Sequence, residues 1–400
     1  MKRPTILQIV PELDTGGAEL SAIEIAGAIV KGGGRALVLT QGGRMAGRVT
    51  EAGGELVQFP AASKNPLRVW LNAGAIARII AKEDVDLVHA RSRAPAWSAK
   101  LAARKTGKAF VTTYHGAYGE GSSLKRAYNR VMAEGDIVIA NSKYTRDLVR
   151  TRYGTAEDRI RVIYRGVDGG DFDPGAIAPS RVEALRRAWG LAPEARVILQ
   201  AARLTNWKGQ SVLIAAARLL RERGALGDAV VVLAGDAQGR DGYKAQLEDE
   251  IASAGLRDQV RLVGHVADMP GAYATAHLAV VASTQPEAFG RVGTESQIMG
   301  CPVIATAIGA PPETVLSEPA VGAGERTGWL VPPSDASAMA DAISAALTLS
   351  AADRAALGAR ARAHVLRSFT LDAMCRQTLA VYDELLATSL QAGFTRGNTQ

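Results

Sequence analysis

The sequence predicts an α/β protein with two doubly wound parallel-sheet domains in tandem. Three observations support this prediction. Short runs rich in Val, Ile and Leu alternate with longer amphipathic stretches, as in parallel sheets that are covered by helices on both faces. The alternation occurs twice, on either side of a segment rich in Gly, Asp and Pro at 164–183. A chain of 400 residues is long enough to bury a separate core in each domain.

The predicted elements follow this alternation along the chain. The stretch AELSAIEIAGAIVKGG predicts a helix that ends at its glycine cluster. The chain after residue 333 is expected to be helical, with a last helix at 371–388 and a frayed tail. The expected strands of the first half are 5–10, 36–40, 55–59, 85–90, 109–115, 137–142 and 160–164. Those of the second half are 196–202, 229–235, 260–264, 278–283, 302–306 and 328–332.

These patterns define the expected domains and the expected place of a site. The first domain takes residues 1–168, the second takes 169–370, and the segment 164–183 is expected to link them. In doubly wound sheets, ligands bind beyond the carboxyl ends of the strands. We therefore expect the site at those ends, in a cleft between the two domains.

Composition narrows the class of protein. No apolar run reaches the roughly 18 residues of a membrane span, and the N-terminus does not resemble a signal peptide. Cys301 and Cys375 lack metal-ligand spacing and are expected to be small buried residues in a reducing compartment. Residues 1–168 carry 26 Lys and Arg against 16 Asp and Glu, so this half has a net charge of +10 and the remainder has −3. This excess indicates either a solvated basic surface or an anionic partner.

Two glycines lie between the first strand and the first helix. Gly16 and Gly17 would let a ligand approach the backbone, and a helix N-terminus offers N–H groups to an anion. The motif GGAE is neither a full dinucleotide fingerprint nor a Walker loop, so an ordinary strand-to-helix turn is the alternative interpretation.

Two cations follow the first strand of the second domain. Arg203 and Lys208 flank a turn in QAARLTNWKGQ, directly before a predicted helix. Two positive charges beside a helix N-terminus suit a diphosphate, although either residue alone would be an ordinary solvated loop charge.

Two carboxylates flank the turn after the strand 278–283. In PEAFGRVGTES, Glu287 lies in the loop and Glu295 lies in the first turn of the next helix. A carboxylate accepts hydrogen bonds from vicinal hydroxyls, so the pair could hold two different sugar rings. The backbone amides of Gly290, Arg291 and Val292 could meet a phosphate between those rings. A sugar, a diphosphate and a ribose together make a nucleotide-sugar.

Five blocks resemble the retaining glycosyltransferases of family 4, which have the GT-B fold. The resemblance covers essentially the whole chain, and its most specific parts are E-x7-E and R-x4-K. In chain order the blocks are GGAE, YHG (114–116), ANS (140–142), ARLTNWKG (202–209) and PEAFGRVGTESQIMGCPVIAT (286–306).

The resemblance implies a role for each matching residue. Glu287 would bind the hydroxyls of the donor sugar, with Ala288 and Phe289 beside it, and Glu295 would bind the ribose. Arg203 and Lys208 would neutralise the diphosphate, and Gly17, next to Gly16, would lie against its distal phosphate. His265 and Val266 would contact the base, and the helix 371–388 would cross back onto the first domain.

The histidine of TTYHG ends the strand 109–115. The resemblance implies that His115 lies beside the reacting carbon of the donor, where it would face Glu287 across the cleft. The alternative is a loop histidine that merely caps a strand. His89 and His277 are expected to have packing or hydrogen-bonding roles.

The predicted reaction is a retaining hexosyl transfer without a metal or other cofactor. The chain lacks a D-x-D motif in a suitable loop, and two cations can neutralise the leaving diphosphate. The blocks HARSRAPAWS and TTYHGAYG resemble lipopolysaccharide-core sugar transferases, including mannosyltransferases, which suggests GDP-mannose as the donor. The basic first domain, including 121–135, would then bind a phosphorylated lipid acceptor at the inner face of the cytoplasmic membrane. No nucleic-acid partner is expected, and the oligomeric state stays open.

Three alternatives remain open from the sequence. The donor could be a UDP-sugar, or the chain could be a nucleotide-sugar epimerase of similar architecture. An NAD-dependent oxidoreductase is also doubly wound, but the sequence lacks the glycine fingerprint followed by an acidic strand end.

Overall fold

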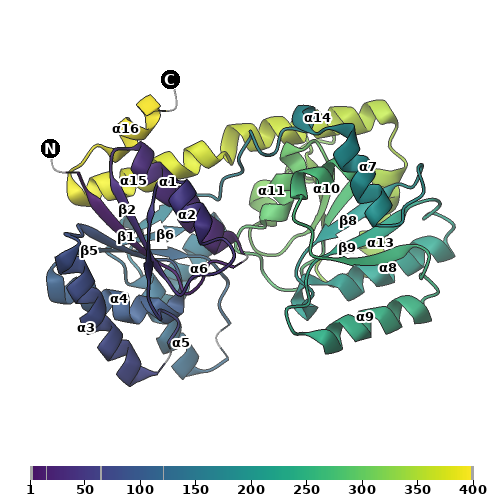
Figure 1. The fold of residues 1–400 in the computed structure, drawn as a ribbon. Coiled ribbons are helices and arrows are strands. Elements are labelled where there is room, and N and C mark those ends of the chain that lie inside the picture. The colour runs from purple at the N-terminus through teal and green to yellow at the C-terminus, as the bar shows by residue number, and fades with distance from the viewer. Residues whose placement is uncertain (1–2, 15, 64, 120, 398–400) are drawn as a thin grey trace. The chain divides into compact units, whose positions relative to one another are not determined.

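The computed structural model describes residues 3–14, 16–63, 65–119 and 121–397. The chain forms two compact units (Figure 1). Unit 1 comprises Met1–Gly166 and Leu371–Gln400, and unit 2 comprises Val167–Thr370.

Unit 1 is built on a seven-stranded parallel sheet with the strand order β3-β2-β1-β4-β5-β6-β7. Its strands are β1 Thr5–Ile9, β2 Arg35–Thr40, β3 Glu55–Gln58, β4 Leu87–Ala90, β5 Ala109–Tyr114, β6 Ile137–Ala140 and β7 Ile160–Val162. Its helices are α1 Gly17–Lys31, α2 Gly47–Glu51, α3 Pro66–Lys82, α4 Arg93–Thr106, α5 Ser123–Asn129, α6 Lys143–Tyr153, α15 Leu371–Leu386 and α16 Leu390–Gly397. Short 3₁₀ turns lie at Arg130–Ala133 and Glu157–Arg159.

Helices cover both faces of this sheet (Figure 1). The helices α3 and α4 pack on one face, and α1, α15 and α16 pack on the other. Because both faces are covered, the central strands are buried at successive positions, as in β1 and β4. The last helix was expected at 371–388, and α15 occupies Leu371–Leu386 within unit 1.

Unit 2 has a six-stranded parallel sheet with the strand order β10-β9-β8-β11-β12-β13. Its strands are β8 Val197–Ala201, β9 Val230–Ala234, β10 Val260–Gly264, β11 Leu278–Val281, β12 Val303–Thr306 and β13 Gly328–Val331. Its helices are α7 Pro179–Ala188, α8 Gln210–Glu222, α9 Asp241–Ser253, α10 Met269–Thr275, α11 Arg291–Ile298, α12 Pro311–Thr314, α13 Ala336–Leu347 and α14 Ala351–Ser368. Short 3₁₀ turns lie at Pro174–Ala176 and Asn206–Lys208.

The segment expected to be a linker at 164–183 is largely an ordered part of unit 2. The units divide after Gly166, and α7 begins at Pro179, whose ring presets the helical φ. Arg362 of α14 donates to the carbonyl of Phe172 and to the carboxylate of Asp173, which ties this segment to unit 2. The Gly, Asp and Pro content therefore marks caps and turns here.

The tail 391–400 was expected to fray, but residues 391–397 belong to α16, and 398–400 lie outside the described residues. Leu390 and Phe394 of α16 are buried in the core of unit 1. A β-carbon on Gly393 would lie 2.4 Å from the carbonyl oxygen of Gly32, so glycine allows α16 to approach the end of α1 closely.

Candidate functional site

The strand order of each sheet reverses at one point, and several of the residues singled out in the sequence follow the strands beside it. In unit 2 the reversal lies between the neighbouring strands β8 and β11, and in unit 1 between β1 and β4. Chains leaving two neighbouring strands in opposite directions open a crevice at their carboxyl ends. Arg203 and Lys208 follow β8, and Glu287 follows β11.

Lys208 and Glu287 form an ion pair although 79 positions separate them. The Lys208 ammonium contacts Oε1 of Glu287, and the side chains are only 18% and 9% exposed. The hydroxyl of Ser283 donates to the same carboxylate oxygen over 2.5 Å. The pair therefore places a carboxylate and an ammonium side by side at the strand ends, in a partly desolvated setting where electrostatic interactions are stronger than in bulk water.

Two glycines hold this pair in place through close backbone approaches. Gly209 has φ +70°, and a β-carbon there would lie 1.9 Å from the carbonyl oxygen of Ala282. Gly309 has φ +87°, and a β-carbon there would lie 2.2 Å from the carbonyl oxygen of Glu287. Glu287 is also bridged to Gly309 through the backbone, so its position is set by the main chain on both sides.

The second carboxylate is held separately. Glu295, in α11, accepts hydrogen bonds from the Tyr273 hydroxyl and from Nε of Arg291, each over 3.1 Å. Its side chain is 13% exposed. Burial, followed by the nearby Glu295 charge, raises the pKa of Tyr273 well above its usual value, so Tyr273 is a neutral donor at Glu295. The two carboxylates thus have different partners, as separate roles would require.

The start of α11 lies between the two carboxylates in sequence. Gly290 precedes the helix with φ +81°, and no side chain caps this end. Val292 lies in the first turn, where backbone N–H groups have no partner within the helix and can bind an anion. Gly290, Arg291 and Val292 therefore stay candidates for the diphosphate.

The remaining predicted residues of unit 2 have mixed settings. Arg203 is exposed, and the structure shows no ion pair for it among the residues described. His265 is exposed after β10, and Val266 is half-buried. Ala288 is buried, and the ring of Phe289 packs edge-on against Phe369 with 5.8 Å between ring centroids. The side chain of Phe289 is therefore a core element, which leaves its backbone for any sugar contact.

In unit 1, Gly16 and Gly17 lie at the start of α1, at the end of the segment that connects this helix to β1. Gly16 has φ +154°, and a β-carbon there would lie 2.3 Å from a carboxylate oxygen of Glu19. Gly17 is the first helical residue, and no side chain caps the helix. The carboxylate of Glu19 therefore lies beside this helix end, at the place where the phosphate hypothesis puts an anion.

His115 directly follows β5 and contacts an arginine that sequence reasoning missed. The Arg165 guanidinium donates to Nδ1 of His115 and to the hydroxyl of Ser21 in α1. Because arginine has no acceptor, Nδ1 must be unprotonated and the proton of the neutral ring lies on Nε2. Nε2 is buried and has no hydrogen-bond partner among the residues that the structure describes. The ring therefore holds one N–H that is ready to donate to a ligand.

Electrostatics keep His115 neutral. Burial, followed by the positive charges of Arg165 and Arg91, holds the pKa of His115 well below its usual value. Arg91 follows β4, and its Nε donates to the side-chain oxygen of Gln8 over 2.5 Å. Its Nη2 is buried and has no hydrogen-bond partner within the described parts of the chain. Neither arginine was singled out in the sequence. The available signal was their position directly after a strand, at the same edge as His115.

The structural role predicted for His89 is confirmed. Its Nδ1 lies 2.7 Å from the hydroxyl of Tyr382 in α15, and its Nε2 lies 2.7 Å from the hydroxyl of Thr113. His89 is completely buried, and burial holds its pKa well below the usual value. This histidine therefore anchors α15 to the sheet of unit 1.

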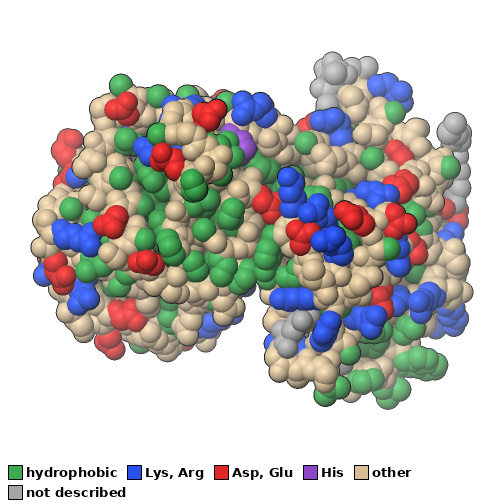
Figure 2. Space-filling view, turned by 180° about the vertical axis from the view of Figure 1, so that it is seen from behind, with side chains coloured by type: hydrophobic (Ala, Val, Ile, Leu, Met, Phe, Trp, Pro, Cys, Tyr) green, Lys and Arg blue, Asp and Glu red, His purple; other side chains and the backbone are tan. Residues whose placement is uncertain are grey.

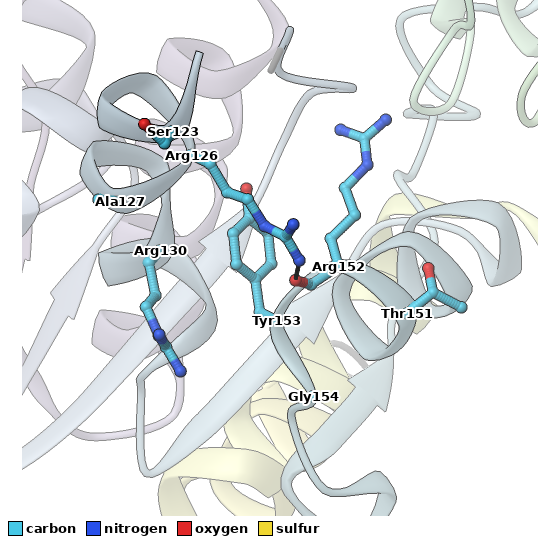
Figure 3. A pocket seen from close by; sticks show the side chains of 8 residues that line it. All are labelled: Ser123, Arg126, Ala127, Arg130, Thr151, Arg152, Tyr153 and Gly154. Carbon is cyan, nitrogen blue, oxygen red and sulfur yellow. Dashed lines mark hydrogen bonds between the residues drawn. The ribbon is translucent and has the colours of Figure 1, made fainter. Parts of the chain in front are cut away.

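A pocket of about 500 Å³ lies in unit 1 between α5 and the C-terminal end of α6 (Figure 3). Arg126 and Arg130 line it from one side and Arg152 from the other. Arg126 donates to the carbonyl oxygen of Arg152, and Arg152 donates to that of Tyr118 over 2.8 Å. The two side chains thus satisfy carbonyl groups, and Arg126 does so at the negative end of a helix dipole. Part of the basic segment 121–135, which was expected to bind an acceptor, therefore stabilises the fold of unit 1.

Two features concern metals and membranes. Among the residues that the structure describes, no three His, Cys, Asp or Glu side chains are grouped as metal ligands. In the same part of the chain, none of the helices has the length and apolar character to cross a membrane. Cys301 and Cys375 are both buried and free.

Two parallel doubly wound sheets in tandem are the architecture of the GT-B class of fold. Residues 15–169 match the family described as Glycosyltransferase Family 4, and residues 181–364 match Glycosyl transferases group 1. A glycosyltransferase of known structure from Rickettsia africae is 34% identical, with a TM-score of 0.86, over 97% of this chain and 100% of the other. The chain therefore belongs to the glycosyltransferases, and the predicted fold class is confirmed.

One further relative was solved with a nucleotide-sugar, and another is named for its substrate. The HepE protein of Anabaena, solved in complex with UDP-glucose, is 25% identical with a TM-score of 0.81, over 95% of this chain and all of HepE. A D-inositol 3-phosphate glycosyltransferase of Salinispora arenicola is 34% identical over 264 residues. This alignment covers 64% of this chain and 57% of the relative, so the chain spans little more than half of that protein.

Proposed function

We propose that this chain transfers a hexose from a nucleotide-sugar to an acceptor hydroxyl, with retention of the anomeric configuration and without a metal. The observation that carries the proposal is the arrangement at the ends of β8 and β11. There Lys208 and Glu287 form a shielded pair, and Glu295 is held independently by Tyr273 and Arg291. One cation and two separately held carboxylates suit a diphosphate that lies between two hydroxyl-bearing rings.

Each part of the donor is assigned to residues of this chain. Arg203, Lys208 and the first turn of α11 neutralise the diphosphate, Glu295 holds the ribose, and Glu287 holds the transferred sugar. In unit 1, His115 donates its Nε2 proton to a sugar hydroxyl, and Gly17 offers its backbone to the distal phosphate. His265 and Val266 contact the base.

The reaction needs no covalent intermediate on the protein. The bond from the anomeric carbon to the diphosphate oxygen breaks, and the acceptor oxygen forms a new bond to the same face of that carbon. The acceptor proton passes to the leaving phosphate oxygen. The protein stabilises the developing negative charge on the diphosphate with Lys208, Arg203 and the α11 amides, and orients the sugar through Glu287 and His115.

Two donors have specific support. The blocks around Trp97 and His115 favour GDP-mannose, and the likeness to HepE, which was solved with UDP-glucose, favours a UDP-sugar. A thermal-shift series with GDP, UDP and ADP separates them, because only the nucleotide that binds the folded chain raises its melting temperature.

Two acceptors also have support. The basic residues of unit 1 favour a phosphorylated glycolipid such as a lipopolysaccharide core, at the inner face of the cytoplasmic membrane. The Salinispora relative is named for a small phosphorylated cyclitol, which makes a soluble phosphorylated acceptor the second candidate.

The activity is tested by incubating the chain with nucleotide-sugars, first without an acceptor and then with candidate acceptors. Slow donor hydrolysis followed by transfer is expected, and NMR of the product should show the anomeric configuration of the donor. Formation of a stereoisomer of the donor would favour the epimerase alternative instead, and inversion in the product would contradict the retaining mechanism.

A further inference from the structure

The exposed apolar side chains of the structure gather on three neighbouring helices of unit 1. On α3, Leu67, Trp70 and Leu71 are 66%, 68% and 54% exposed, and their spacing places them on one side of the helix. Leu101 of α4 and Leu124 of α5 are 40% and 82% exposed. These five residues make up most of the large exposed hydrophobic side chains in the described parts of the chain. We call them, with the surfaces of α3, α4 and α5 around them, the α3–α5 face.

The core does not need these side chains. The opposite side of α3 buries Ala73, Ile76, Ala77 and Ile80 in the core, where they pack beside α4. The N-terminal end of α3, where these exposed side chains lie, is capped by Asn65. The side-chain oxygen of Asn65 accepts hydrogen bonds from the backbone amides of Leu67 over 3.0 Å and Arg68 over 3.3 Å. This cap holds the first turn in helical form and thereby fixes the apolar side chains in position.

The charge of the same helices has a single sign. Together α3, α4 and α5 carry nine Lys and Arg residues and no Asp or Glu. Lys100 is paired with Glu134 over 2.5 Å, but the side chains of Arg68, Arg104, Lys105 and Lys125 are exposed. Figure 2 shows hydrophobic side chains gathered over α3, at the lower right, with Lys and Arg side chains along their border.

We propose that the α3–α5 face docks on an anionic lipid membrane, with Leu67, Trp70 and Leu71 in the boundary between headgroups and acyl chains. Apolar residues bordered by cations match a membrane whose interior is apolar and whose headgroups are negatively charged. Tryptophan favours this boundary because its ring is apolar and its N–H is polar. A second copy of the chain fits poorly, because pairing this face with itself would bring two sets of cations together. The proposal rests on the lipid acceptor proposed above and names the surface by which the enzyme reaches it.

The primary test measures binding of the full chain to phosphatidylglycerol/phosphatidylcholine vesicles by flotation, without donor or acceptor. Trp70→Glu is expected to lower vesicle affinity about tenfold or more, since it removes the largest apolar side chain and adds a negative charge. Leu124→Glu is expected to act in the same direction. The matched control is Leu366→Glu on α14 of unit 2, where the leucine is 41% exposed, and it should bind like the wild type.

A second measurement reports insertion directly. Brominated lipids should quench the fluorescence of the wild type, and Trp70→Phe should lose this quenching while it keeps most of its vesicle affinity. Removing one exposed cation, as in Arg68→Gln, should weaken binding about fivefold at low salt. Raised salt should weaken binding of the wild type as well.

The outcomes separate this proposal from the proposed transferase activity. Unchanged vesicle binding by Trp70→Glu, or equal binding to neutral and anionic vesicles, would overturn the membrane proposal. A wild-type dimer that Trp70→Glu converts to a monomer would show that the face is a contact between copies. GDP or UDP should stabilise the wild type and Trp70→Glu equally. Vesicle binding without any stabilisation by these nucleotides would leave the membrane proposal intact and contradict the transferase proposal.

Discussion

Replacement of each carboxylate of the nucleotide-sugar site should produce a different kind of loss. Glu295→Ala removes a carboxylate whose oxygens each accept one hydrogen bond, from Tyr273 and from Arg291. Each oxygen keeps a further lone pair for a ribose hydroxyl. A hydrogen bond to a charged group is worth about 1.5–3 kcal/mol, so binding of the nucleoside diphosphate should weaken about 10- to 150-fold.

Glu287→Ala should behave differently because Glu287 holds Lys208 and not the ribose. Its removal frees the Lys208 ammonium for the diphosphate, so affinity for the nucleoside diphosphate should stay near the wild-type value or rise. Turnover should fall, on the order of 100-fold, because the transferred sugar loses the group that orients it.

The assay is calorimetric binding of GDP or UDP, whichever stabilises the wild type, together with steady-state transfer rates. Glu248→Ala is a matched control, because this carboxylate of α9 is 52% exposed and pairs with the neighbouring Lys244 on the surface of the same helix. If Glu287→Ala weakens nucleotide binding as much as Glu295→Ala, the assignment of one carboxylate to each ring is wrong.

Three further predictions follow from the buried charges. Lys208→Met should weaken diphosphate binding about 10- to 100-fold by calorimetry, since a charge-assisted contact is lost and Glu287 stays unpaired; unchanged affinity would remove Lys208 from the site. Arg165→Met should raise the pKa of His115 in an NMR titration, because a neighbouring positive charge is removed, and should lower turnover more than nucleotide affinity. An unchanged pKa of His115 would contradict the conclusion that Arg165 orients this ring and keeps it neutral. The pKa values of His89 and His115 are depressed in the fold, so the unfolded chain binds more protons than the folded chain below pH ~6.5. The free energy of unfolding should therefore fall as the pH drops below that value. Urea midpoints that stay constant between pH 7 and 5 would contradict this prediction.

Much of the fold and part of the site could be predicted from local patterns. The Val- and Ile-rich runs of β1, β8 and β11 identify strands because both faces of a parallel sheet are buried, and helical stretches between them imply crossovers. Since ligands bind at the carboxyl ends of such strands, the residues that follow β8 and β11 are candidates from the amino-acid sequence alone. Lys208 and Glu287 do meet there.

The errors have a common physical cause. Gly, Asp and Pro at 164–183 suggested a linker, but the same residue types cap and start helices, as Pro179 does in α7. The tail was expected to fray because chain ends are often poorly ordered, but Phe394 and Gly393 pack α16 against unit 1. Local composition does not report which distant surface is available to cover a segment.

By itself, the sequence determined two parallel sheets, the edge of each sheet that carries the candidate site, and the residue types expected there, because strand and helix periods are local properties of the chain. Only the tertiary structure decided the contacts that control chemistry. Arg165 meets His115 across 50 positions and sets which nitrogen of the ring carries the proton. Likewise, the pattern of α3 indicates that one side is buried, but only the packed neighbours show that Leu67 and Trp70 on its other side remain uncovered. Such contacts join residues far apart in the chain, and each depends on how the intervening elements pack.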